Sequence, residues 1–270
     1  TVSSLPIVTL NSLNPICLNN TPFVVNGGSP VGGVYSANGI SNGIFDPQVT
    51  GIGNFNINYT YTDSLGCTSN SETFLTVKPL PNTTLTSFND LCIDATNLVL
   101  SNGVPIGGTY SGNGINNGIF YPDSSGIGNH TITYTGELNG CFVSDSQTIT
   151  VNPLPILSFS SILELCVNDS LVLNLISPTG GIYSGNSINN GIFYSNNTNL
   201  GINSINYTYT DLNSCTNNQT ISLIVNNLTN ITSSNSLINE FCFNDSISVL
   251  NNYFPIGGTY FGNGISNNLF

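Results

Sequence analysis

The chain has 270 residues and a formal net charge of −12, because it contains 13 acidic side chains and a single basic one, Lys78. Nucleic-acid binding and docking on anionic lipid both need several Lys or Arg side chains, so the charge balance argues against both kinds of partner. The apolar content of 39%, rich in Ile, Val, Leu, Phe and Tyr, indicates a folded protein despite the abundance of Asn and Ser.

The surface implied by this composition is weakly charged and rich in Asn, Ser, Thr, Gly and Tyr, which suits a protein that works outside the cell. No apolar run reaches the roughly 18–20 residues of a membrane span, so membrane insertion is not expected. No signal peptide is visible, and Thr1-Val2 matches the end of a repeat, so we expect the chain to be a window on a longer array.

An internal repeat dominates the sequence. The block GGTYSGNGINNGIF at residues 107–120 has close copies at 32–45, 180–193 and 257–270. Self-similarity at a fixed period indicates a tandem array. It predicts three units of about 75 residues and a partial fourth. The expected boundaries are 1–4 for the end of a preceding repeat, then 5–79, 80–153, 154–227 and 228–270.

Each unit reads as a series of short strands. In chain order, the third unit offers residues 156–159, a cysteine-bearing turn and residues 171–175, followed by the glycine-rich block. Asn-Gly pairs in that block are typical of tight turns, and the Ile-Phe pairs after them predict short core-facing strands. We expect the block to place its Tyr and its Ile-Phe pair in the core.

The clearest strand covers residues 54–62, where polar and apolar residues alternate strictly, and a last strand follows at 72–77. A tyrosine ahead of the second cysteine is a candidate tyrosine corner. No segment has helical periodicity. These features predict an all-β fold of tandem Ig-like β-sandwich repeats. The Leu-Pro joins, such as Leu80-Pro81, predict a rod-like array.

The cysteines keep the period of the repeat. Each unit begins with one, and a second follows 49 or 50 residues later. This spacing predicts one disulfide per repeat and an oxidising compartment, and each bond would contribute about 4 kcal/mol. A metal site is the alternative, but no CxxC or Cys/His cluster is present. The expected pairs are Cys17–Cys67, Cys92–Cys141 and Cys166–Cys215, with the partner of Cys242 beyond the chain.

Catalytic and cofactor sites are not expected. His130 is the only histidine and occurs in one repeat, so we expect a surface or edge residue there. Asp63 and Asp211 recur after the alternating strand, but the second repeat has Gly136-Glu137 at that place. No EF-type Ca²⁺ loop exists, and a Ca²⁺ ion held between repeats by scattered acids is left open. The chain is therefore expected not to be an enzyme.

The combination of GGTYSGNGI, GIGNHTITYT, GC and TITVNPLP resembles the tandem Ig-like (PKD-like) repeats of giant cell-surface proteins of Bacteroidota, which include flavobacterial-type, gliding-associated adhesins. The resemblance covers nearly the whole chain. It implies an extracellular place, at the cell surface or in a secreted filament. It also implies O-linked glycans at Asp-Ser-apolar tripeptides, although Asp-Ser is also ordinary turn chemistry. The candidate acceptors are Ser64, Ser170 and Ser246.

Two functions remain open at this point. In the first, the repeats form a structural stalk or filament segment that extends from the cell and supports adhesion or gliding. In the second, the repeats themselves bind glycans, surfaces or neighbouring filaments. The expected partners are neighbouring repeats of the same chain and other copies in a filament or bundle. A stalk predicts surface residues that vary between repeats, whereas an adhesive array predicts the same patch on every unit.

Overall fold

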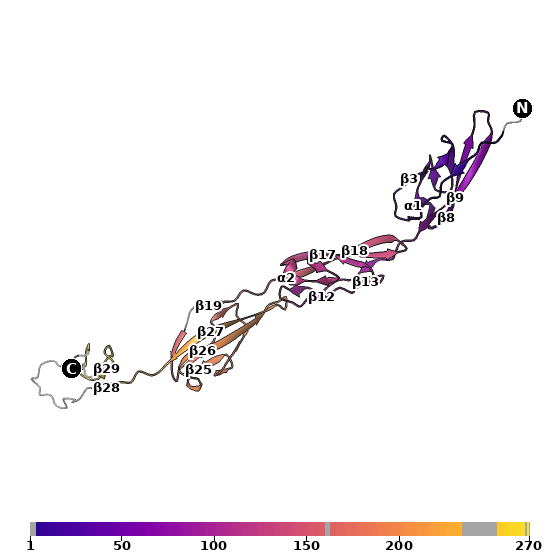
Figure 1. Ribbon diagram of the computed structural model, residues 1–270. Coiled ribbons are helices and arrows are strands. Elements are labelled where there is room, and N and C mark those ends of the chain that lie inside the picture. The colour runs from indigo at the N-terminus through magenta and orange to yellow at the C-terminus, as the bar shows by residue number, and fades with distance from the viewer. Residues whose placement is uncertain (1–3, 160–162, 234–252, 268, 270) are drawn as a thin grey trace, which may run out of the picture. The chain divides into compact units, whose positions relative to one another are not determined.

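A computed structural model describes residues 4–159, 163–233, 253–267 and 269 (Figure 1). The fold is all-β, with three repeated Ig-like sandwich units, as the sequence predicts. The chain divides into two compact units, Thr1–Leu154 and Pro155–Phe270. The first contains two repeats and the second contains the third.

A four-stranded sheet forms one layer of each repeat. Its centre is a long antiparallel hairpin, and its edges are a short antiparallel strand and a short parallel strand that carries the first cysteine. The strand orders are β2(Ile16–Cys17)-β9(Thr68–Lys78)-β8(Gly53–Thr62)-β5(Val34–Ser36), β11(Leu91–Cys92)-β18(Cys141–Asn152)-β17(Gly128–Leu138)-β14(Thr109–Ser111) and β20(Leu163–Cys166)-β27(Thr216–Asn226)-β26(Gly201–Thr210)-β23(Ile182–Ser184).

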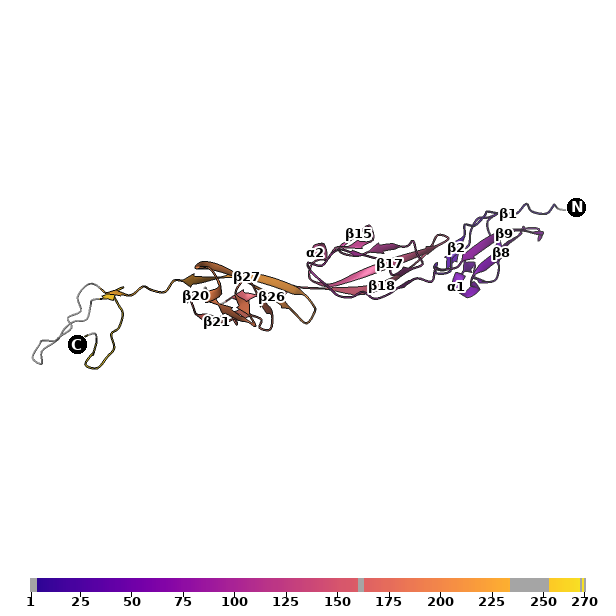
Figure 2. The same cartoon turned by 90° about the horizontal axis from the view of Figure 1, so that it is seen from below.

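The opposite layer is made of shorter strands, and Figure 2 shows it for the second repeat, where β15 lies apart from β17 and β18. Its three-stranded sheets are β3(Phe23–Val24)-β7(Ile44–Phe45)-β6(Ile40–Ser41), β12(Leu98–Val99)-β16(Ile119–Phe120)-β15(Ile115–Asn116) and β21(Ser170–Val172)-β25(Ile192–Tyr194)-β24(Ile188–Asn189).

A two-stranded ribbon opens each repeat. These ribbons are β1(Thr9–Leu10)-β4(Gly28–Ser29), β10(Thr84–Leu85)-β13(Gly103–Val104) and β19(Ser158–Phe159)-β22(Ile176–Ser177). The same pairing recurs after the third repeat, between β28(Thr232–Ser233) and β29(Tyr253–Phe254).

Strand alternation decides what enters each core. In β8 the side chains of Ile57 and Tyr59 are buried, whereas Asn56, Asn58 and Thr60, which alternate with them, belong to the opposite face of the strand. The Ile-Phe prediction is half right, because neighbouring residues of a strand point to opposite faces: Phe45 is fully buried and Ile44 is exposed. His130 is not a surface residue as expected. It lies inward like Phe55, and its Nε2 contacts Gly126 O at 2.8 Å.

The glycine-rich block is explained by two tyrosines whose rings pack at a tilt of 49°. In the second repeat the rings of Tyr110 and Tyr134 lie 4.6 Å apart. The Tyr110 hydroxyl accepts a hydrogen bond from Gly103 N at 2.6 Å. The Tyr134 hydroxyl accepts from Gly108 N at 2.8 Å and donates to Pro105 O. These partners lie 26 and 29 residues upstream of Tyr134. Tyr134 therefore binds the backbone of the glycine-rich loop and does not form the expected tyrosine corner.

The structure adds short helices that the sequence did not indicate. They are α1(Pro47–Thr50), α2(Pro122–Ser125) and a 3₁₀ turn at Ser195–Asn197. Asp46 caps the first, since its Oδ1 accepts from Gln48 N at 2.9 Å, and Pro47 supplies the fixed φ that suits a first helical position. A single turn is too short to produce a helical period.

The contact between glycine and tyrosine gives a first prediction. A Cβ at Gly108 would lie 2.4 Å from Thr135 O and 2.5 Å from the Tyr134 ring, so Gly108→Ala should destabilise the second repeat by about 3 kcal/mol or more. Gly107→Ala is the matched control, because a Cβ there meets nothing within 4 Å and only the positive φ of 99° adds strain, at about 1 kcal/mol. Denaturant unfolding followed by tyrosine fluorescence measures both. Equal losses for the two variants would contradict this packing argument.

Candidate functional site: the inter-repeat junction

The two cysteines of one repeat lie at opposite ends of the same sheet. Cys17 is the Cα partner of Lys78, the last residue of β9, whereas Cys67 immediately precedes Thr68, the first residue of β9. Eleven residues of extended strand separate the two positions by about 35 Å. A disulfide requires Cα atoms within about 7 Å, so the bond cannot form within the repeat.

The three predicted disulfides are therefore wrong. Cys17 is bonded to Cys141 of the next repeat, with a Cα–Cα distance of 5.7 Å and a sequence separation of 124. This bond excludes Cys17–Cys67 and Cys92–Cys141. Cys166–Cys215 is excluded because Cys215 is in a disulfide and Cys166 is a free thiol. The two ends of the last strand are again the reason, since Cys92 pairs with Asn152 at the far end of the 12-residue β18, and Cys166 pairs with Asn226 at the far end of the 11-residue β27.

The remaining described cysteines are also either disulfide-bonded or free thiols. Cys92 is also in a disulfide, whereas Cys67 is a free thiol like Cys166. Cys242, whose partner was expected beyond the chain, lies outside the described residues.

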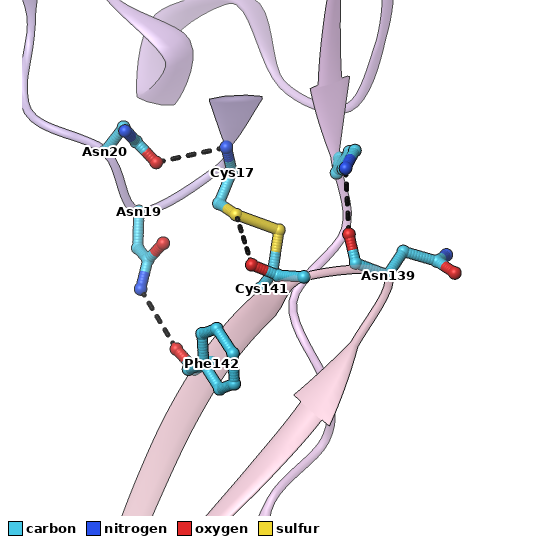
Figure 3. Close-up of a disulfide and its surroundings, with 8 residues drawn as sticks. Cys17, Asn19, Asn20, Asn139, Cys141 and Phe142 are labelled. Carbon is cyan, nitrogen blue, oxygen red and sulfur yellow. Dashed lines mark hydrogen bonds between the residues drawn. A yellow bond between two sulfur atoms is a disulfide. The ribbon is translucent and has the colours of Figure 1, made fainter. Parts of the chain in front are cut away.

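The Cys17–Cys141 bond is the centre of a junction between the first and second repeats (Figure 3). Lys78 Nζ donates a hydrogen bond to Asn139 O at 2.8 Å, so the one basic side chain of the protein binds the tip of the β17–β18 hairpin. Asn19 Nδ2 donates to Phe142 O at 3.5 Å. One covalent bond and two hydrogen bonds thus connect the end of one repeat to the hairpin of the next.

Local turn chemistry presents both cysteines. Asn139 and Gly140 have φ values of 53° and 83°, which a two-residue hairpin turn requires and which Asn and Gly tolerate, and Cys141 follows directly. On the other side, Asn20 Oδ1 accepts from Cys17 N at 3.0 Å and Asn20 N donates to Cys17 O at 3.0 Å. This closed turn fixes the position of the Cys17 sulfur at the end of the repeat.

The peptide chain crosses the same junction through Pro79-Leu80-Pro81. Proline fixes φ, and Pro81 is buried, so this connection is stiff as well as short. The two repeats are therefore tethered at two places, which resists both bending and twisting more than a single linker would.

Other predicted site residues have structural roles or remain predictions. Asp63 Oδ1 accepts from Leu65 N and Cys67 N, and Asp211 makes the equivalent bonds, so both acids shape turns. Ser64 and Ser170 are exposed, and their glycosylation stays a prediction; Ser246 lies outside the described residues.

Neither a metal-binding cluster nor a membrane-spanning helix occurs among the described residues. No group of three or more His, Cys, Asp or Glu side chains in that part of the chain gathers in a way that could hold a metal ion. No helix within it is long and apolar enough to cross a membrane.

Comparisons with known proteins give only fold-level similarity. No protein-family model and no curated protein matches the sequence. Similar solved structures include the I67–I69 fragment of titin, at 10% identity and a TM-score of 0.34, over 84% of this chain and all of the fragment. A Ca²⁺-stabilized adhesin with which an Antarctic bacterium binds ice has 13% identity and a TM-score of 0.35, over 86% of this chain and 78% of that one.

The insect immune protein hemolin is a third similar structure, at 11% identity and a TM-score of 0.29, over 86% of this chain and 79% of hemolin. Similarities of this size assign neither a family nor a function. The Ig-like description of this chain rests on its own strand order.

The junction disulfide gives a second prediction. Cys17→Ser with Cys141→Ser should lower the free energy of unfolding of the first two repeats by up to about 5 kcal/mol, because the 124-residue closed loop is lost from the unfolded state. Cys67→Ser is the matched control and should change it little, since Cys67 is a free thiol. Guanidinium unfolding under non-reducing conditions measures both effects. A loss of equal size in Cys67→Ser would contradict the assignment.

Proposed function

We propose that this chain is a stalk segment of a large extracellular bacterial surface protein that extends from the cell and supports adhesion or gliding. The observation that carries the proposal is the disulfide between repeats, Cys17–Cys141, with its hydrogen-bonded junction. A stalk must keep its length and direction under load. A covalent bond placed between repeats serves both needs, whereas a bond inside each repeat would leave the joints free.

The disulfide also changes which residues carry a pulling force. Tension applied to the two ends passes from Cys17 directly to Cys141, so the covalent path avoids the chain between them. Residues 18–140 include most of the first repeat and the β17 strand of the second. Loss of their tertiary structure would therefore not lengthen the stalk while the disulfide is intact.

The outward faces of the hairpins support the stalk over an adhesive array. They are nearly uncharged and mostly polar, with exposed apolar residues such as Phe74 and Ile202, and their residues change from repeat to repeat. The position of Phe74 in β9 is taken by Thr148 in β18 and Ser222 in β27, as their place beside the buried Leu75, Ile149 and Leu223 shows. A ligand-binding face copied in every unit would keep its contact residues.

An extracellular place fits the same chemistry. Disulfides persist in oxidising compartments, and the described chain has several cysteines committed to them. We propose no enzymatic activity, because the residues considered as catalysts, His130, Asp63 and Asp211, contact the backbone of their own turns and strands.

Single-molecule stretching tests the stalk proposal. When the chain is pulled from its ends, reduction of the disulfides should release at least the segment from Cys17 to Cys141, whose sequence separation of 124 adds a contour length of about 410–450 Å. Cys67→Ser with Cys166→Ser is the matched control, and it should extend like the parent because both are free thiols. An extension that does not change on reduction would overturn the mechanical role.

One repeated surface feature favours the second function, contact with neighbouring filaments. Each three-stranded sheet carries an outward Val-Ile cross-strand pair, at Val24↔Ile44, Val99↔Ile119 and Val172↔Ile192. The valines are 66%, 67% and 64% exposed. Exposed apolar pairs that recur in register are suited to contact between copies of the same chain.

A triple substitution tests this alternative. If the pairs join filaments, Val24→Ser, Val99→Ser and Val172→Ser together should abolish concentration-dependent association in analytical ultracentrifugation, because they remove the shared apolar contact. Ile7→Ser is the control, since Ile7 is 87% exposed but lies outside these sheets. A parent chain that stays monomeric over the whole concentration range would leave the stalk as the only proposed role.

A further inference from the structure

We propose that Cys67 and Cys166 are disulfide cysteines of two further junctions, each bonded in the mature protein to a cysteine of an adjoining Ig-like repeat of the same kind. The proposal rests on the stalk function, because it requires repeats on both sides. It assigns a covalent site, and its partner chemistry, to the two thiols that are free in the structure.

Cys166 has the same place in the third repeat as Cys17 has in the first. It pairs with Asn226 at the end of β27 as Cys17 pairs with Lys78 at the end of β9. The residue after each cysteine donates to the carbonyl of that strand end, with Val167 N to Asn226 O at 2.8 Å and Leu18 N to Lys78 O at 3.1 Å. Cys17 is bonded in this position, and so is Cys92 of the second repeat.

Cys67 has the same place in the first repeat as Cys141 and Cys215 have in the second and third. It precedes the last long strand of its repeat, as Cys215 precedes β27, and Cys141 opens the equivalent strand β18. Both counterparts are in disulfides and are 0% exposed, whereas Cys67 is partly exposed. At the junction described above, Cys17 and Asn19 of the preceding repeat contact Cys141 and Phe142. A preceding repeat that contacted Cys67 in the same way would bury it as Cys141 is buried.

The direction of the known bond fixes the partners. Cys17, a strand-end cysteine, bonds to the hairpin-tip cysteine of the following repeat. The partner of Cys166 is therefore a hairpin-tip cysteine of the repeat that follows, and the partner of Cys67 is a strand-end cysteine of the repeat that precedes. Cys67 cannot use Cys17 of its own repeat, because about 35 Å separates them. The adjoining repeat belongs to the same polypeptide or to a second copy of the chain.

Formation of each bond needs an oxidant, for which a small-molecule disulfide such as oxidised glutathione suffices. The Cys166 thiolate attacks one sulfur of that disulfide, forms a mixed disulfide and releases one thiolate. The partner thiolate then attacks the Cys166 sulfur and releases the second. Two protein thiols are oxidised to one disulfide, and one small disulfide is reduced to two thiols.

Disulfide mapping of native surface material is the first test. Alkylation before reduction should leave Cys67 and Cys166 unlabelled, and each should appear in a cross-linked peptide with a cysteine from an Ig-like repeat. An unchanged electrophoretic mass on reduction assigns the partner to the same polypeptide, whereas a fall to a fraction of the mass assigns it to a second copy. Alkylation of either cysteine in the unreduced, folded protein would overturn the proposal for that cysteine.

A gain-of-bond experiment tests Cys166 directly. A second copy of residues 194–227, appended after Phe270 in a Cys242→Ser background, supplies a long hairpin and a copy of Cys215. Cys166 should then become linked to the appended cysteine and lose its reactivity toward alkylating reagents. The matched control carries Ser at the appended cysteine, and there Cys166 should stay fully alkylated. A fully alkylated Cys166 in both proteins, with Cys17–Cys141 intact, would contradict the proposal. That result would leave the stalk function standing, because the stretching experiment depends on Cys17–Cys141 and not on Cys166.

Discussion

The position of the disulfides depends on the length of one strand. In each repeat the second cysteine lies at one end of the last strand, and the residue that pairs with the first cysteine lies at the other end. In the first repeat, the 11 residues of β9 follow Cys67 and end at Lys78, which pairs with Cys17. At about 3.3 Å per residue, this strand spans nearly the whole sandwich. A cysteine at each end can reach only what lies beyond that end. The two sulfurs of one repeat can therefore form disulfides with adjoining repeats but not with each other.

The core supports this arrangement through the glycine-rich block. The hydroxyl of Tyr134 in β17 binds the backbone of the loop at Gly108 and Pro105, and Tyr110 packs against its ring. Side chains at Gly103 or Gly108 would collide with that ring, which explains the glycines. The block therefore anchors β14 and the loop before it to the long hairpin. A hairpin held along its length can present Cys141 at its tip.

The sequence was sufficient for the fold and insufficient for the pairing of cysteines. Strict alternation at 54–62 and the Asn-Gly turns predicted the strands, because period 2 and positive φ are local properties. The disulfides are non-local, and a spacing of 49 or 50 residues does not say whether two cysteines meet. The signal in the sequence is the length of the last strand after Cys141, because a strand of that length keeps the two cysteines of a repeat too far apart to bond. The expectation of a surface or edge position for His130 is wrong, because the register of its strand places it on the inward face.

Disulfides between repeats also address the small size of each unit. A sandwich of about 75 residues buries only about 60–65% of its unfolded surface, so its own core gives limited stability. Cys17–Cys141 closes a loop that contains parts of two sandwiches, so the unfolded ensemble of both is restricted by one bond. With Lys78 holding the Asn139 carbonyl at the same joint, neighbouring repeats stabilise one another. Stability is then a property of the array, which is what a load-bearing stalk requires.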